Sequence, residues 1–252
     1  MKAYVKSKIL KGVGELEFYH PKSNSLPYSL LEKLSLEIKK LGDDNKVKCI
    51  VLKSGGTKAF CAGASFDELL SIQNQRDGKK FFLGFAKVIL AIKQAPKLVL
   101  TCVQGKVVGG GIGLVCASDY VLAHESADIK LSELSIGIGP FVIAPVLQRK
   151  LGLTHFTNIC LNPKQWKTSG WALDKGIFSE VFSDLDELNL RVTQLTSEYV
   201  NYSPEAICEI KNMLWNGFDS IEKEMDKRAE QSGRLVLSDY TVQILKSLQS
   251  KQ

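Results

Sequence analysis

Short strand-like and helix-like segments alternate through the first half of this 252-residue chain, and this alternation limits the fold more than any other feature. Polar and apolar side chains alternate on both sides of Lys11-Gly12, which predicts a β-hairpin. The segments that we predict are hairpin strands at 3–9 and 14–19, helices at 30–41 and 66–90, and buried strands at 47–52, 98–103 and 119–123. Strands that alternate with helices indicate an α/β core.

The pattern changes beyond residue 185, where only helix-like segments follow. They cover residues 185–199, 204–215, 221–236 and 241–248. Ser203-Pro204-Glu205 is a typical start of one of these helices. We therefore expect a catalytic core over residues 1–195 and an all-helical C-terminal region over residues 196–252.

Composition excludes several classes of protein. No run of about 18 apolar residues exists that could span a membrane, and the charged N-terminus lacks the apolar stretch of a secretory signal. The net charge of +6 is spread along the chain without a basic block, so we expect no nucleic-acid partner. Six cysteines without CxxC spacing and three scattered histidines predict reduced thiols, a cytoplasmic protein and no metal site.

Two glycine-rich segments carry the chemical signal. The first is Lys58–Phe66, which follows a predicted strand, and the second is Gly105–Gly113, which leads into a predicted helix. Small residues let backbone N–H groups approach a ligand, and a helix N-terminus adds partial positive charge. No Gly-Lys-Ser/Thr follows the glycines, and their spacing is not that of a dinucleotide fingerprint. Two such turns could aim two N–H donors at one oxygen, as in an oxyanion hole.

Together with three later motifs, these segments resemble the crotonase (enoyl-CoA hydratase/isomerase) superfamily over about residues 5–180. The later motifs are Ser118-Asp119, Leu131-Ser132-Glu133 and Ile136-Gly137. The resemblance implies an α/β spiral of repeated ββα units with a helical C-terminal region used in trimerisation. It also implies an acyl-CoA thioester ligand, a homotrimer or dimer of trimers, and no cofactor besides the coenzyme A that enters with the substrate.

The resemblance also assigns candidate site residues. The backbone N–H groups of Ala64 and Gly110 correspond to the two oxyanion-hole donors, and Ala62 corresponds to the position whose main chain holds the adenine. Lys58 and Lys246 are candidates for contact with the phosphates. The residues that we expect to contact substrate are Lys58, Ala62, Ala64, Phe66, Gly109, Gly110, Phe141 and Lys246.

The reaction depends on two positions at which hydratases of the family carry glutamate. This chain has Gly113 at the first position and Glu133 at the second. Hydration needs one group for the water and one for the α-carbon proton, whereas a single base can shift a double bond. The segment around Glu133 resembles that of single-glutamate Δ3,Δ2-enoyl-CoA isomerases. We therefore expect Glu133 to be the general acid/base.

Apolar neighbours should raise the pKa of Glu133, since burial disfavours the charged carboxylate. The expected neighbours are Leu131, Leu134, Ile136 and Phe141. Phe141 also occupies the position of the dehalogenase-type aspartate and of the peroxisomal-type isomerase glutamate, which excludes both chemistries. Asp119 is expected to hold main-chain groups.

Two alternatives stay open. Asp67 or Glu68 could reach the pocket and restore hydration, for example of a branched substrate such as 3-methylglutaconyl-CoA, or they could simply favour a helix N-terminus. In the alternative of a different class, the chain is a non-catalytic acyl-CoA-binding protein.

Overall fold

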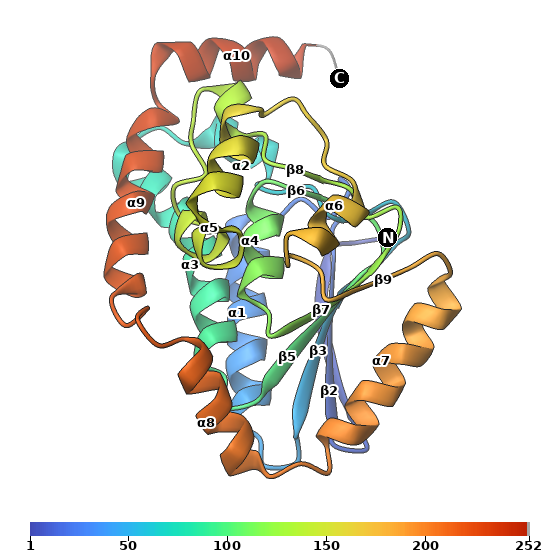
Figure 1. The fold of residues 1–252 in the computed structure, drawn as a ribbon. Coiled ribbons are helices and arrows are strands. Elements are labelled where there is room, and N and C mark those ends of the chain that lie inside the picture. The colour runs from blue at the N-terminus through green and yellow to red at the C-terminus, as the bar shows by residue number, and fades with distance from the viewer. Residues whose placement is uncertain (251–252) are drawn as a thin grey trace.

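The computed structural model describes residues 1–250, and its centre is a twisted six-stranded sheet in the order β1-β2-β3-β5-β7-β9 (Figure 1). The strands are β1 (Tyr4–Leu10), β2 (Val13–Tyr19), β3 (Cys49–Ser54), β5 (Leu98–Val103), β7 (Tyr120–His124) and β9 (Glu180–Phe182). The β1–β2 pair is antiparallel and the other pairs are parallel. This confirms the predicted hairpin and the predicted α/β core.

A second, smaller sheet makes the chain a spiral of repeating units. Its three parallel strands are β4 (Ala59–Cys61), β6 (Lys106–Val108) and β8 (Ile129–Lys130). Each of them directly follows a strand of the large sheet, and helical structure comes next in the chain. The expected succession of ββα units is therefore present.

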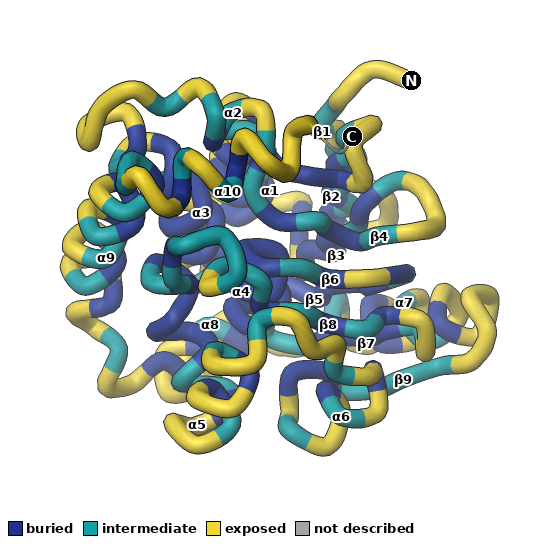
Figure 2. The backbone as a smooth tube through the Cα atoms, turned by 90° about the horizontal axis from the view of Figure 1, so that it is seen from above, coloured by how far each residue is buried: buried dark blue, intermediate teal, exposed yellow. Residues whose placement is uncertain are grey.

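The helices cover both faces of the large sheet and continue into a helical C-terminal region. They are α1 (Tyr28–Asp43), α2 (Phe66–Ser71), α3 (Gln75–Gln94), α4 (Gly110–Ala117), α5 (Ala144–Leu161), α6 (Ser169–Asp174), α7 (Leu185–Tyr199), α8 (Pro204–Leu214), α9 (Ile221–Leu235) and α10 (Asp239–Gln249), with a 3₁₀ turn η1 (Glu133–Ile136). α1 and α3 pack together on one face, and α7 packs on β7 and β9. Buried residues concentrate between these layers (Figure 2).

One predicted helix was wrong in its extent. The segment expected to be helical over residues 66–90 forms two helices, with a break at residues 72–74. Asn74 favours the start of α3, because its side chain accepts a hydrogen bond of 3.0 Å from the N–H of Asp77 and so caps this helix. The break matters because it lets α2 run in a different direction from α3. α2 then forms part of the wall of the cavity described below, while α3 packs along the core.

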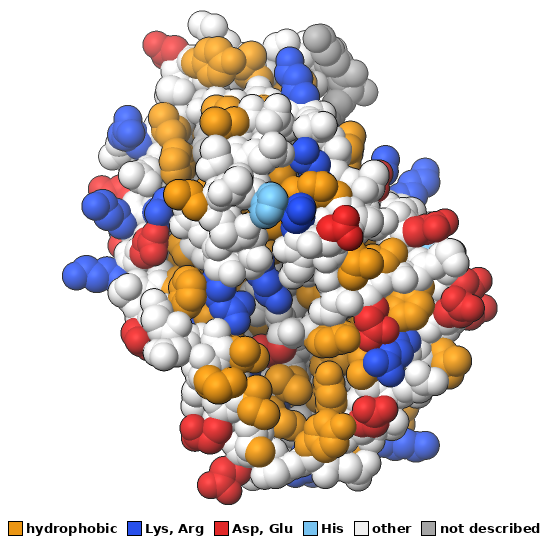
Figure 3. Space-filling view, viewed as in Figure 1, with side chains coloured by type: hydrophobic (Ala, Val, Ile, Leu, Met, Phe, Trp, Pro, Cys, Tyr) orange, Lys and Arg blue, Asp and Glu red, His pale blue; other side chains and the backbone are white. Residues whose placement is uncertain are grey.

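The surface carries mixed charges. On the face in Figure 3, acidic and basic side chains are interspersed, and hydrophobic side chains gather in the lower part, over α7 and α8. Exposed Leu190, Ile210 and Met213 belong to these two helices. Within residues 1–250, no helix combines the length and the apolar character needed to cross a bilayer.

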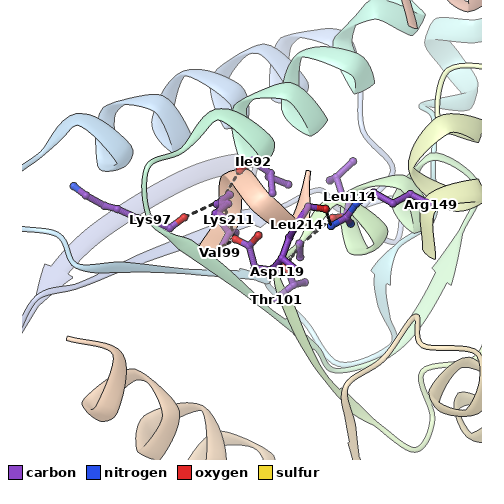
Figure 4. A network of polar contacts seen from close by, with 10 residues as sticks. Ile92, Lys97, Val99, Thr101, Leu114, Asp119, Arg149, Lys211 and Leu214 are labelled. Carbon is purple, nitrogen blue, oxygen red and sulfur yellow. Dashed lines mark hydrogen bonds and ion pairs between the residues drawn. The ribbon is translucent and has the colours of Figure 1, made fainter. Parts of the chain in front are cut away.

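A buried ion pair fastens α8 to the sheet (Figure 4). The ammonium group of Lys211 donates to the carboxylate of Asp119 at 2.8 Å and to the carbonyls of Ile92 and Lys97 at 2.7 and 2.9 Å. Asp119 also accepts a 2.8 Å hydrogen bond from the N–H of Val99, which is the main-chain role expected for it. Burial lowers the pKa of Lys211, so the charged state depends on these partners.

We predict that Lys211→Met lowers the free energy of unfolding by about 3–5 kcal/mol, because it leaves the carboxylate of Asp119 buried without its cation. Lys8→Met is the matched control, since Lys8 pairs with Glu15 at 3.4 Å while its own side chain is 65% exposed. That control should cost less than about 1 kcal/mol. Urea unfolding of both variants measures the difference, and equal losses would contradict a structural role for the buried pair.

Candidate active site

A cavity of about 530 Å³ opens between the glycine-rich turns and the C-terminal helices. Its walls come from α2, α3, the start of α4, the region of η1, α9 and α10. This volume lies in the range typical of small-molecule sites. The cavity therefore joins the two segments singled out in the sequence with helices more than a hundred residues away.

The backbone of Gly110 supplies one free donor to this cavity. Gly109, with φ of 53°, turns the chain into α4, and Gly110 is the first helical residue. Its N–H points out of the first turn and has no acceptor within the helix. A side chain on Gly110 would collide with the ring of Phe85, since a Cβ there would lie 2.4 Å from a ring carbon. The cavity wall thus requires glycine at this position.

Ala64 supplies a second donor beside the first. Ala64 forms an isolated parallel β-bridge with Leu26. Its two hydrogen bonds run from the N–H of Leu26 to the carbonyl of Gly63 (2.8 Å) and from the N–H of Ser65 to the carbonyl of Leu26 (3.1 Å). The N–H of Ala64 therefore stays free. A Cβ on Gly63 would lie 3.7 Å from the amide nitrogen of Gly110. The two glycine-rich turns therefore meet, and both free amides belong to residues that line the cavity.

Glu133 places a carboxyl group beside these amides. A Cβ on Gly109 would lie 2.9 Å from Oε1 of Glu133. Oε2 of Glu133 is shielded from solvent and has no hydrogen-bond partner. Burial raises the pKa of Glu133 to about 7, against a weaker opposing effect of the backbone N–H groups of Ser132 and Glu133. A carboxyl group with this pKa can both accept and release a proton near neutrality.

The apolar residues around Glu133 are mostly those expected. Leu131 is buried, and Ile136 and Phe141 line the cavity. The expectation for Leu134 was wrong, because this side chain is 46% exposed. η1 is a tight turn with about three residues per turn, and it directs Leu134 away from the side of Glu133.

Most of the expected contact residues share this one cavity. Its lining includes Ala62, Ala64, Phe66, Gly109, Gly110, Glu133 and Phe141. Lys58 and Lys246 are exposed and lie outside the lining, so their contact with phosphates stays a prediction. Phe85, Ser232 and Leu248 also line the cavity, and they lie in segments 79–90 and the helical tail, from which the sequence predicts part of the lining. Lys22 lines the cavity too and was missed, because no local pattern links it to the glycine-rich turns.

The two carboxylates considered as replacements for the missing glutamate have other partners. Asp67 lines the cavity but forms an ion pair with Lys22 at 2.5 Å, and its side chain is 60% exposed. Glu68 accepts a 2.6 Å hydrogen bond from the N–H of Tyr28, the first residue of α1. Glu68 thus caps a helix N-terminus, although of α1 and not of its own helix.

The surroundings of Gly113 leave no room for a carboxylate. A Cβ at this position would lie 2.4 Å from Cγ2 of Ile143 and 3.2 Å from Cδ1 of Ile89. Two isoleucines therefore fill the space next to the second turn of α4. A longer side chain would require at least one of them to move.

The described residues form no metal cluster, and the thiol within the first glycine-rich segment is not reactive. Within residues 1–250, no three histidine, cysteine or acidic side chains gather to hold a metal ion. Cys61 is the cysteine nearest the glycine-rich turns, and burial raises its pKa to about 12. Its thiol thus stays protonated at neutral pH and is a poor nucleophile.

The raised pKa of Glu133 predicts a pH-dependent stability. Its stabilising contribution is complete below pH 4.5, where the carboxyl group is protonated in both states, and is lost as the pH rises to about 7. Glu133→Gln stays neutral, so its stability relative to wild type should increase by on the order of 3 kcal/mol from about pH 4.5 to about pH 8. Urea unfolding at several pH values measures this difference.

Glu15→Gln is the control of opposite sign. Burial alone would raise the pKa of Glu15, but the ammonium groups of Lys53 and Lys8 outweigh burial and lower it. The control variant should therefore lose stability relative to wild type as the pH rises. A flat profile for Glu133→Gln would contradict a buried carboxyl group.

Known proteins resemble this chain over most of its length. A "Probable enoyl-CoA hydratase" of Bacillus subtilis is 26% identical over 229 residues, which cover 90% of this chain and 88% of that protein. The peroxisomal Delta(3,5)-Delta(2,4)-dienoyl-CoA isomerase of Arabidopsis thaliana is 26% identical over 212 residues, or 78% of this chain and 75% of that protein.

The fold has close counterparts among solved structures. The crystal structure of enoyl-CoA hydratase from Bacillus halodurans superimposes with a TM-score of 0.91 at 22% identity, covering 97% of this chain and 99% of that chain. Residues 8–244 match the family model described as Enoyl-CoA hydratase/isomerase. This match spans nearly the whole chain and includes both glycine-rich turns and Glu133, so the chain belongs to the enoyl-CoA hydratase/isomerase family.

Proposed function

We propose that the protein isomerises the double bond of enoyl-CoA thioesters, in the manner of a Δ3,Δ2-enoyl-CoA isomerase, with Glu133 as the one acid/base. The observation that carries this proposal is the carboxyl group of Glu133 beside two free amides, with one of its oxygens shielded from solvent and without a partner. Asp67 also lines the cavity, but its largely exposed carboxylate is paired with Lys22. A site with one available carboxyl group suits a proton shuttle.

The reaction follows from the placement of these groups. The thioester oxygen accepts from the N–H groups of Ala64 and Gly110, and Glu133 removes a proton from the α-carbon. The electrons of that C–H bond form the enolate, whose charge the two amides stabilise. Glu133 then returns its proton to the γ-carbon, and the double bond moves from the β,γ to the α,β position. The carboxylate is regenerated, and neither water nor another cofactor is consumed.

A pKa near 7 serves both half-reactions. The carboxylate must be basic enough to take a proton made acidic by the thioester, and the acid must release it again to the γ-carbon. A fully solvated carboxylate with an ordinary pKa would be a weaker base. Desolvation beside the enolate therefore contributes to catalysis as well as to the pH dependence of stability.

The same family contains hydratases, and Gly113 is the reason to favour isomerisation. Position 113 has no side chain, and Ile143 and Ile89 occupy the space around it, so a carboxylate is missing at the position where hydratases of the family carry their first glutamate. We further propose that the coenzyme A moiety lies along Lys58–Ala64 and that the chain works as a homotrimer or a dimer of trimers. The exposed apolar side chains of α7 and α8 support association between copies.

We predict that Glu133→Gln reduces the isomerisation of 3-octenoyl-CoA about 10³-fold, because the amide cannot carry the proton. The matched control is Asp67→Asn, the same change at the ion-paired carboxylate of the same cavity, and it should stay within a few-fold of wild type. Formation of the 2-enoyl product measures both. Equal activity of wild type and Glu133→Gln would contradict the proposal.

The same assay separates the alternatives. Rapid water addition to crotonyl-CoA or 3-methylglutaconyl-CoA, lost in Asp67→Asn, would establish hydration in place of isomerisation. Tight acyl-CoA binding without conversion of any of these thioesters would establish a non-catalytic binding protein.

We also predict that Gly113→Glu gains no hydratase activity and is destabilised by about 1–3 kcal/mol, because its side chain meets Ile143. The double variant Gly113→Glu/Ile143→Ala removes that obstacle and should recover stability relative to the single variant. Urea unfolding and crotonyl-CoA hydration measure the two effects. Hydration of crotonyl-CoA by the single variant would contradict this prediction, because it would show that a glutamate side chain fits beside Ile143 and Ile89.

A further inference from the structure

One polar residue that lines the cavity has no role in the proposed reaction. Ser232 of α9 lines the cavity, is 1% exposed, and its Oγ has no hydrogen-bond partner. Buried serines in helices usually donate to a carbonyl of the preceding turn. Ser35 of α1 does so, at 2.8 Å from the carbonyl of Glu32. Ser232 is therefore an exception.

Helix α3 shows how far Ser232 lies from the free amides. Phe85 of α3 packs against Gly110, while Gly78 packs against Gly233, where a Cβ on Gly78 would lie 2.8 Å from the Cα of Gly233. The seven steps along α3 from Gly78 to Phe85 advance about 10 Å along a helix. Ser232, the neighbour of Gly233, thus belongs to the end of the cavity remote from Gly110.

Apolar side chains make up much of the rest of the lining. Phe82 lies between Phe85 and Gly78 on α3, and Leu69 of α2 and Leu248 of α10 are further members. A buried hydroxyl group without a partner costs free energy that a ligand oxygen would recover. A purely hydrocarbon chain would leave this cost in place.

Within residues 1–250, the lack of an available cation near Ser232 disfavours an anionic ligand group there. Lys22 is the one lysine or arginine among the described residues of the lining, and it is already paired with Asp67. Asp67 is the second residue of α2 and follows Ala64 by three positions, so the pair lies near the Ala64 turn. A buried carboxylate at the Ser232 end would therefore lack a cation. A neutral oxygen needs none.

We propose that Ser232 is a specificity-determining residue that selects acyl-CoA thioesters carrying a neutral oxygen, a hydroxyl or keto group, at the far end of a medium-length acyl chain. The hydroxyl group of Ser232 donates to that oxygen or accepts from it. This inference relies on the proposed function only for the placement of the thioester at Ala64 and Gly110.

Binding of saturated thioesters tests the proposal, because these ligands cannot isomerise. Calorimetry on the full chain compares octanoyl-CoA with omega-hydroxyoctanoyl-CoA, and hexanoyl and decanoyl pairs bracket the chain length. We expect the hydroxylated ligand of one chain length to bind wild type about tenfold more tightly than its plain counterpart. Ser232→Ala should abolish this preference and leave the affinity for the plain ligand equal or higher.

Ser35→Ala is the matched control, a buried helical serine outside the cavity lining, and should keep the preference. The omega-carboxylated thioester of the same length should bind more weakly than the hydroxylated one. Equal binding of plain and hydroxylated ligands by wild type at every length, or a preference that survives in Ser232→Ala, would overturn the proposal. Failure to isomerise 3-octenoyl-CoA despite a Ser232-dependent preference would overturn only the proposed function.

Discussion

Desolvation of one carboxyl group is the constraint on which the rest of the site depends. Glu133 lies against the backbone of Gly109, with one oxygen shielded from solvent and without a partner. A charged carboxylate in such surroundings is unfavourable, so its pKa rises to about 7. The glycines at 109 and 110 permit this approach, because side chains there would displace the carboxyl group or Phe85. The desolvation of Glu133 and the packing of Phe85 thus both require glycine in the turn at residues 109 and 110.

The C-terminal helices complete the cavity that this turn begins. α9 crosses α3 where Gly78 and Gly233 remove side chains from the contact, which brings Ser232 to the wall of the cavity. α10 packs on α2 and η1 and adds Leu248. Farther from the cavity, α8 is held by the buried pair of Lys211 with Asp119 at the start of β7 (Figure 4). The helical region therefore supplies part of the cavity wall, in addition to the role in assembly that we propose for it.

Sequence reasoning succeeded where structure follows from local spacing. The hairpin turns at Lys11-Gly12, where both residues have positive φ, and the small residues of the two glycine-rich segments permit the close approach of their backbones. It was wrong on the helix predicted over residues 66–90, because the chain leaves the helical conformation after α2 and Asn74 caps a second helix, α3. It was also wrong on Leu134, because a tight turn does not place neighbouring residues on one face.

The sequence by itself determined the α/β order of elements and the family, and it singled out Glu133 as the candidate acid/base, since each depends on motifs whose residues are close together in the chain. Only the tertiary structure decided that Asp67 pairs with Lys22, that Ile143 fills the space beside Gly113, and that Ser232 lines the same cavity as Glu133. These contacts join residues 30 to about a hundred positions apart. No periodicity of a helix or strand extends that far, and packing alone brings such side chains together.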